Sequence, residues 1–290
     1  GRKQMDNLKA KKRHPEEIAV YTAIYVCAAF SVLLLLGIII YVFAKGARRV
    51  NWAFLTGVTS ILHGTVGIAG NILNTLIIIL LTMIITTPIG VGAAIYLNEY
   101  AKPGKLVTVI IFATETLAGI PSIIFGLFGM LFFGQLCHMG YSLLTGSLTL
   151  TLMVLPLVTR NTQEALKTVP DSFRTGAVGL GAGKWYTIRT ILLPSAMPGI
   201  VTGVILAIGR IIGESAALLF TAGSAHLLPK TFDAFLEKIF HSGGTLTIQL
   251  YLSASKGEFE VAFGIAVVLL VIVLLINFGT KRLAKKLEKH

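Results

Sequence analysis

The stretch TQEALKTVPDSFRTGAVGLGAGKWYTIRTILLP, residues 162–194, is a charged, glycine-rich segment between long apolar runs. Val169-Pro170 should end any helix that enters this segment, because proline disfavours helical geometry in the residue before it. Asp171 or Ser172 can then cap a new helix, whose apolar residues recur at helical spacing. The segment therefore predicts a short helix that starts directly after the proline.

Glycines divide the same segment into two helices. Gly181 and Gly183 should end the first helix, because glycine readily adopts the left-handed conformation that often follows a helix end. A second short helix is expected over 184–192, and Pro194 should stop it. Two short helices joined by a bend form a shape that suits docking into a groove on another protein.

The composition of the chain indicates an integral membrane protein. Hydrophobic residues make up 54% of the sequence and charged residues only 13%, with a mean hydropathy of +0.81, whereas soluble domains are about 25% charged. The formal net charge of +12 is concentrated in clusters beside apolar runs, which is typical of membrane orientation. The sequence has no basic face interleaved with aromatic residues, so we expect no nucleic-acid partner.

The apolar runs predict an all-α fold, a polytopic bundle of six transmembrane spans in one domain over 18–281. The third run is longer than the about 20 residues that cross a bilayer, and Gly119-Ile120-Pro121 should break it into two segments. In the second run, Thr86-Thr87-Pro88 should interrupt the helix and free backbone carbonyls. The six expected spans are 18–44, 71–97, 106–134, 147–158 with its flanks, 195–222 and 259–280.

Basic residues set the expected orientation of the bundle. Both tails, 1–17 and 282–290, are strongly basic, and the segment 162–194 carries further Lys and Arg residues. Because cytoplasmic loops are enriched in Lys and Arg, we expect both tails and this segment on the cytoplasmic side. The segment 232–240 is expected outside, as an amphipathic helix on the rim of the bundle or as a contact for another protein.

Arg210 and Glu214 lie within the expected fifth span, where a charge costs about 2.5–3.5 kcal/mol and normally faces a partner or a water-filled path. They are four residues apart, so on a helix they share one face and can form an ion pair. Two interpretations remain open: a structural ion pair, or an anion path in which the planar guanidinium binds a tetrahedral oxyanion. In the second case Glu214 would orient Arg210 and weaken anion binding, and Ser215 would add a hydroxyl.

The third span carries a second set of candidates. Glu115 is expected to be a buried acid that pairs with a base, either Arg210 or one from another subunit. Pro121-Ser122 can start a half-helix whose N–H groups point at an anion, or can simply kink the span. The predicted substrate pathway therefore consists of Arg210, Glu214, Ser215, Glu115 and Ser122.

The sequence offers no site for catalysis, metal or nucleotide binding. Cys27 and Cys137 lack the paired spacing of a zinc site, and no HExxH or GxSxG motif occurs. Gly183-Lys184 is no phosphate-binding loop, because Val178 and Trp185 stand where that loop needs a glycine and a hydroxyl residue. We therefore expect no enzyme activity, no metal and no cofactor in this chain.

The segment 162–194 resembles the cytoplasmic signature loop of ABC-type importer permeases. That loop contains Glu-Ala-Ala, three residues, Gly, nine residues, Ile, one residue and Leu-Pro, and this sequence departs from it at Thr175 and Gly176. Thr175 replaces an acid of the family pattern, so a charge contact with the ATPase subunit at this position is not implied. The residues expected to couple the chain to an ATPase are Thr175, Gly176, Ala177, Gly181, Gly183, Lys184, Ile191, Leu193 and Pro194.

Three further motifs are similar to phosphate-specific ABC importer permeases, and to their A-type subunit more than to the C-type partner. They are AGIPSIIFGLFG (118–129), GRIIGESAALLFTAG (209–223) and TLTIQLYLSAS (245–255). The resemblance implies a type I importer fold in the bacterial inner membrane and a heterodimer with a second, homologous permease. It also implies a dimeric ATPase subunit that binds the ATP, an extracytoplasmic phosphate-binding protein, and a part for Arg210 in phosphate movement.

Other functions remain open from the sequence. A permease for sulfate, molybdate or phosphonate is the nearest alternative, because the residues themselves indicate only a tetrahedral anion. A secondary transporter or channel driven by an ion gradient would show internal repeats with paired broken spans, and no obvious repeat is visible. A membrane-embedded enzyme would need a nucleophile or metal constellation, and the sequence contains none.

Overall fold

The computed structural model of the protein describes residues 15–60, 65–229 and 231–287. In these ranges the regular secondary structure is helical apart from one antiparallel hairpin, in which β1 (Val58–Ser60) pairs with β2 (Thr65–Ile68). Most of the predicted tail 1–17 lies outside the described residues. The long helices are α2 (Pro15–Gly46), α4 (Ala69–Ile95), α5 (Lys105–Gly119), α7 (Leu143–Lys167), α10 (Leu193–Gly213) and α14 (Phe259–Leu287).

Shorter elements connect these helices. Those near the hairpin are η1 (Ala47–Arg49) and α3 (Trp52–Thr56), and those that follow α4 and α5 are η2 (Tyr96–Tyr100), α6 (Ser122–Gly129) and η3 (Met130–Leu136). The remaining short elements are α8 (Asp171–Gly179), α9 (Lys184–Thr187), η4 (Ile188–Leu192), α11 (Ala216–Thr221), α12 (Phe232–Glu237), η5 (Lys238–Phe240) and α13 (Leu246–Ser255).

The prediction of an all-α membrane bundle is confirmed. Five helical stretches in the described part of the chain are long and apolar enough to cross a membrane. A sixth crossing is formed if the bent pair of α5 and α6 with η3 counts as one span. The two halves of that pair meet at 103°, at the predicted break Gly119-Ile120-Pro121, because Ile120 and Pro121 adopt extended backbone geometry.

Helix α7 lies at the centre of the bundle and packs against α4 and α10. Its Leu150 and Val154 side chains are fully buried in the main apolar cluster. Since lipid tails are as apolar as leucine, close packing rather than water exclusion holds such helices together. Gly203 of α10 permits this packing, because a Cβ at that position would lie 2.7 Å from the Cβ of Asn161 on α7.

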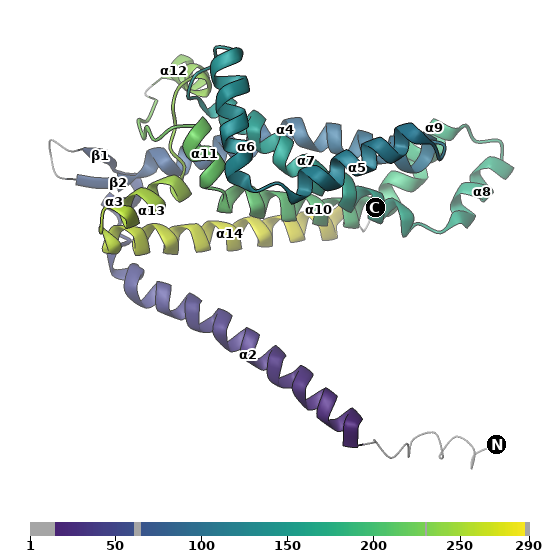
Figure 1. Cartoon of the computed structure of the whole chain (residues 1–290), viewed down its shortest axis with the longest axis horizontal. Helices are drawn as coiled ribbons and strands as arrows, with labels where there is room; N and C mark the ends of the chain where they lie inside the picture. Colours follow the sequence, from purple (N-terminus) through teal and green to yellow (C-terminus); the bar gives the residue numbers. More distant parts are fainter. Residues whose placement is uncertain (1–14, 61–64, 230, 288–290) are drawn as a thin grey trace.

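Helix α2 diverges from the rest of the bundle (Figure 1). Its apolar span is entirely unburied within this chain. It contacts α14 near its C-terminal end, where the rings of Tyr41 and Phe263 meet edge to face with centroids 5.7 Å apart.

The segment 162–194 and the helix α12 lie at opposite ends of the bundle (Figure 1). The predicted amphipathic helix over 232–240 is confirmed as α12 and η5, with Phe235 and Ile239 packed against the main apolar cluster and Phe232 and Phe240 exposed. The two ends of the bundle therefore carry different secondary-structure elements. One end carries α8 and α9, and the other carries α12 and the hairpin.

Two predictions about prolines are wrong. Helix α4 continues through Pro88, because a transmembrane helix tolerates an interior proline when neighbouring groups satisfy the freed backbone carbonyls. Pro194 does not stop a helix but stands in the first turn of α10, directly after the π-helical turn η4. A proline is tolerated in a first turn because its missing N–H has no helical partner there.

The predicted cap of α8 is also wrong in detail. Pro170 occupies the N-cap position, without a side-chain hydrogen bond, and Asp171 is the first helical residue. An acid in the first turn is favourable because the helix N-terminus carries partial positive charge. The break itself is confirmed, since α7 ends at Lys167 and α8 begins at Asp171.

Candidate functional site

A cavity of about 420 Å³ opens between α5, α7, α10 and the end of α4. Half of its lining residues are apolar, and charged side chains from three helices face it. The cavity contains three cationic and two anionic groups, so it carries a small positive excess suited to an anion. Its lining residues are Leu97, Ile111, Thr114, Glu115, Leu117, Ala118, Met153, Pro156, Leu157, Arg160, Gln163, Glu164, Lys167 and Arg210.

Arg210 and Glu115, both predicted in the substrate pathway, line this cavity together. Arg210 comes from the last turn of α10 and Glu115 from the middle of α5. Both side chains are exposed within this chain, so the expectation of a buried Glu115 is wrong for the single chain. The ion pairs formed within the described residues are Lys167–Glu164, Arg174–Glu99 and Arg174–Asp171. The guanidinium of Arg210 therefore faces the cavity without a carboxylate partner from the described residues.

Sequence reasoning missed the contribution of α7 to the cavity. Arg160, Gln163, Glu164 and Lys167 all line it, together with apolar residues one to two turns earlier on the same helix. Residues three and four apart on a helix share one face, and these positions follow that spacing. A helical projection of α7 could have found Arg160 as a second guanidinium beside Arg210.

Glu214 does not pair with Arg210 in the predicted way. Helix α10 ends at Gly213, and Glu214 leaves it with extended backbone geometry (φ −82°, ψ 123°). Its carboxylate accepts a hydrogen bond from the backbone N–H of Ala217 at 3.1 Å and thereby caps the next helix, α11, because a helix N-terminus attracts negative charge. The expected fifth span over 195–222 is consequently broken rather than continuous.

The other two predicted pathway residues lie outside the cavity lining. Ser215 follows Glu214 at the start of α11, and its carbonyl accepts a hydrogen bond from Leu219 N. Ser122 begins α6, so the predicted half-helix start at Pro121-Ser122 is confirmed. Its part in anion binding stays a prediction.

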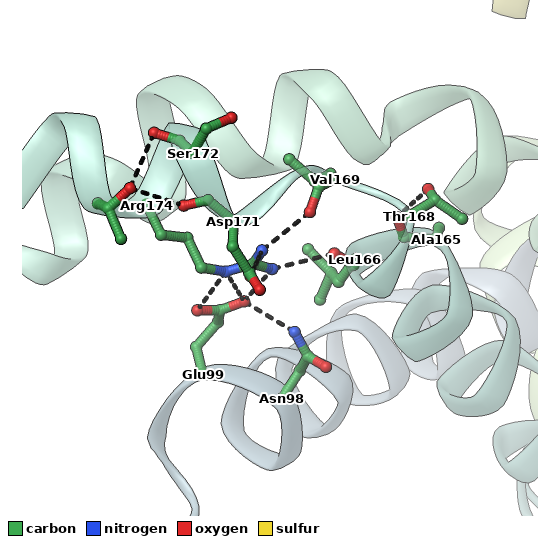
Figure 2. A network of polar contacts seen from close by, with 10 residues as sticks. Asn98, Glu99, Ala165, Leu166, Thr168, Val169, Asp171, Ser172 and Arg174 are labelled. Atoms are coloured by element: carbon green, nitrogen blue, oxygen red, sulfur yellow. Dashed lines mark hydrogen bonds and ion pairs between the residues drawn. The ribbon is translucent and has the colours of Figure 1, made fainter.

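Arg174 of α8 is the centre of a polar network at the end of the bundle that carries the predicted coupling loop (Figure 2). Its Nη2 atom donates to Glu99 Oε1 at 2.9 Å and to the carbonyl of Leu166 at 3.0 Å. Its Nη1 atom donates to the carbonyl of Val169 and to Asp171 Oδ1, both at 3.0 Å. The hydrogen bond with Glu99 raises the pKa of Arg174 above its ordinary value, so the residue stays charged.

The predicted coupling loop exposes a group of apolar side chains. Ala177 is buried and anchors α8, whereas its neighbours on the outer surface are unburied. Exposed apolar groups of this size rimmed by polar residues mark interaction surfaces. The exposed members are Phe173, Val178, Leu180, Trp185 and Tyr186.

The bend between α8 and α9 depends on Gly181. Its φ is +79°, a left-handed conformation that glycine adopts without strain. The N–H of Ala182 can therefore return to the carbonyl of Ala177 at 2.9 Å, which closes the end of α8 as predicted. Gly183 is the N-cap of α9, and the Lys184 ammonium lies 4.7 Å from the ring centroid of Tyr100 in η2.

The remaining residues of the predicted loop occupy two environments. Thr175 and Gly176 lie exposed on α8, where the Thr175 hydroxyl donates to the carbonyl of Asp171 at 3.2 Å. Ile191 belongs to η4, and Leu193 with Pro194 starts α10. Leu193 packs against an apolar cluster that includes Leu166, Ile188 and Leu192 and joins the loop to the bundle.

The chain forms a bundle of membrane-length helices around a cavity with a small positive excess, and one end of the bundle carries an exposed apolar loop. This is the organisation of a transport permease. The chain belongs to the family of binding-protein-dependent transport system inner membrane components, whose pattern matches residues 86–290. It is therefore a multi-pass membrane component of a transport system.

Curated relatives agree with this assignment. The chain is 35% identical over 273 residues to the probable ABC transporter permease protein YqgI of Bacillus subtilis, covering 91% of this chain and 93% of that protein. It is 34% identical over 277 residues to the phosphate transport system permease protein PstA of Xylella fastidiosa, covering 94% of each.

Solved structures show the same fold. A bacterial alginate ABC transporter, in complex with its pentasaccharide-bound periplasmic protein, contains a chain with a TM-score of 0.70 at 14% identity, covering 94% of this chain and 96% of that one. The MetNI methionine ABC transporter contains one with a TM-score of 0.55 at 21% identity, covering 76% of this chain and 94% of that one. The predicted type I importer permease fold is confirmed.

Proposed function

We propose that the chain is one permease subunit of an ATP-driven importer of inorganic phosphate. The observation that carries this proposal is the cavity in which Arg210 and Arg160 face a common space from α10 and α7. A guanidinium offers paired N–H donors that match the oxygens of a tetrahedral oxyanion. The similarity to PstA over nearly the whole chain supports phosphate as the anion.

The mixed charge of the cavity suits the passage of an anion better than its tight binding. Arg210, Arg160 and Lys167 attract an anion, while Glu115 and Glu164 lie on the same walls and oppose tight binding. A transport path needs binding that is favourable enough for entry and weak enough for release. Because α7 carries its polar residues toward the end that bears α8, the anion would leave toward that end.

The chain would work with several partners. A second, homologous permease would complete the path as a heterodimer, and a dimeric ATPase would bind α8 and α9 through their exposed apolar side chains. ATP would be bound by that ATPase, so this chain would need no cofactor of its own. An extracytoplasmic phosphate-binding protein would dock at the end that carries α12.

The orientation follows from the same proposal. With α8 and α9 in the cytoplasm, the C-terminal end of α14 lies on the cytoplasmic side, since it reaches the same end of the bundle (Figure 1). The basic tails 1–17 and 282–290 fit this orientation, because Lys and Arg are enriched on the cytoplasmic side. Both termini would then be cytoplasmic.

Reconstitution of the complete complex in liposomes tests the proposal. ATP hydrolysis and solute uptake are measured with binding protein loaded with phosphate, sulfate or molybdate. We expect phosphate-loaded binding protein to stimulate both activities, and the other anions to stimulate neither. Stimulation by sulfate or molybdate alone would assign the chain to another oxyanion, and uptake that needs an ion gradient but no ATPase would indicate a secondary transporter.

A further inference from the structure

Arg174 uses every N–H donor of its guanidinium within this chain. The Nε atom donates to both oxygens of Glu99, at 3.3 and 3.4 Å. The two Nη atoms share four acceptors between them: Glu99 Oε1, Asp171 Oδ1 and the carbonyls of Leu166 and Val169. Polar networks in which each member is satisfied are rigid. Arg174 therefore fixes the position of α8 on the bundle.

Two of the acceptors of Arg174, Leu166 and Glu99, belong to different transmembrane helices. Leu166 lies in the last turn of α7, and Val169 follows that helix. Glu99 lies in η2, the continuation of α4, and its side chain is only 8% exposed although it is charged. One side chain of α8 thus joins the cytoplasmic ends of α7 and α4, which Figure 2 shows from close by.

These attachment points are next to the wall of the cavity. Leu97, which lines the cavity, is two residues before Glu99 on the same continuous helix. Glu164 and Lys167, which also line it, lie on either side of Leu166 on α7. A displacement of α8 that is carried by Arg174 would therefore move two walls of the cavity at once.

A second contact ties the same two parts of the chain together. The ammonium of Lys184 in α9 lies over the ring of Tyr100, the residue after Glu99. Both short helices of the coupling loop therefore contact η2, each through one cationic side chain. By contrast, the side chain of Arg189 in the neighbouring η4 is exposed and forms no hydrogen bond or ion pair within the described residues.

We propose that Arg174 is a positioning residue that transmits the movement of α8 to the ends of α4 and α7, and so opens and closes the cavity toward the cytoplasm. This inference rests on the proposed function, because it requires an ATPase that moves α8. Arg174 would make no contact with the anion. Loss of Arg174 would uncouple ATP hydrolysis from transport and would not weaken the docking of the ATPase or of the binding protein.

The test measures phosphate transported per ATP hydrolysed in the reconstituted complex with phosphate-loaded binding protein. The variants are Arg174→Lys, Glu99→Gln and the control Arg189→Gln. Lysine keeps the charge but has three donors on one atom and cannot reproduce the planar five-donor fork. Glu99→Gln keeps the other acceptors of Arg174 and weakens only the link to α4.

We expect the Arg174→Lys complex to keep ATPase binding and stimulated hydrolysis. The ratio of phosphate transported to ATP hydrolysed should fall by about fivefold or more, since fivefold is the lower end of typical coupling between two sites. Glu99→Gln should lower the ratio less, and Arg189→Gln should leave it unchanged. A wild-type ratio in both Arg174→Lys and Glu99→Gln would overturn the inference. If Arg174→Lys does not assemble, Glu99→Gln decides: a lowered ratio supports the inference and a wild-type ratio contradicts it. Failure of the wild-type complex to transport phosphate at all would contradict the proposed function instead.

Discussion

The cavity and the predicted coupling loop contain arginines that differ in how many of their donors are paired within the chain. Arg174, at the coupling loop, uses all its donors on Glu99, Asp171 and two backbone carbonyls. Arg210 and Arg160, in the cavity, have no hydrogen-bond or ion-pair partner in the part of the chain that the structure describes. A guanidinium that is fully paired holds structure together, whereas one that faces a cavity unpaired is free to bind an anion. In the proposed importer the same residue type would therefore serve two separate tasks.

The largest expected effect concerns the unpaired arginine. Arg210→Gln should reduce phosphate uptake by roughly 10- to 150-fold, because a hydrogen bond to a charged group contributes about 1.5–3 kcal/mol. Uptake is measured in liposomes, with copurification of the ATPase as the measure of assembly. The ATPase should copurify as it does with the wild type. Uptake at the wild-type rate would make Arg210 a structural residue and remove the contrast with Arg174.

A backbone change at the coupling loop should have the next largest effect. Gly181→Val places a β-branched side chain at φ +79°, which costs about 1–2 kcal/mol and should weaken binding of the ATPase by roughly 5- to 30-fold. Affinity is measured with the purified ATPase subunit. Gly179→Ala is the matched control, because a Cβ at Gly179 meets nothing within 4 Å and its backbone is helical. Equal binding by the two variants would mean that the bend does not position the docking surface.

The second cavity arginine should matter less than the first. Arg160→Gln should lower phosphate uptake by about fivefold to tenfold, because Lys167 and Gln163 continue the same polar face of α7 and can share the anion. Adding Lys167→Gln should then lower uptake further. Uptake in the double variant equal to that of Arg160→Gln would show that the two residues do not act along one path.

The smallest expected effect lies at the opposite end of the bundle and concerns a buried cation that donates to one backbone carbonyl among the described residues. Lys238 is 7% exposed and donates to the carbonyl of Leu227. Burial lowers the pKa of Lys238 below its ordinary value of 10.5. The unfolded chain therefore binds more protons than the folded chain between the lowered pKa and 10.5, so stability should rise with pH across that window.

Thermal unfolding in detergent between neutral and alkaline pH measures this dependence. In Lys238→Met the alkaline rise in stability contributed by this residue should disappear. A rise of the same size in the variant would assign the dependence to other groups.

Local sequence signals predicted most of the fold. Long apolar runs identified the spans. Glycine and proline residues identified the helix breaks at Gly119-Ile120-Pro121, Val169-Pro170 and Gly181. Such signals work because proline narrows the range of backbone conformations and glycine widens it, whatever distant residues the segment contacts. Pro194 shows their limit, since the same residue can end a helix or begin one. Here a π-helical turn runs directly into α10, and Pro194 stands in the first turn of that helix.

The site was predicted less completely because it depends on contacts between distant segments. Arg210 and Glu115 could be singled out, since charges within apolar runs are rare. Glu214 was predicted to share a helix face with Arg210 but lies beyond the end of that helix. The end of α10 at Gly213 has no sequence signal that distinguishes it from the glycines before it. The Arg174–Glu99 pair joins residues 75 positions apart, and spacing along the chain contains no information about such a pair.

The most direct test of the account is electron cryomicroscopy of the assembled complex with phosphate, held by nucleotide in the state that encloses the substrate. Tetrahedral density is expected within about 3 Å of the guanidinium of Arg210 or Arg160 and should be absent from the Arg210→Gln complex. Arg174 should keep its hydrogen bonds to Glu99 in both complexes. Density for the anion elsewhere, with Arg210 and Arg160 paired to carboxylates of the neighbouring subunit, would contradict it.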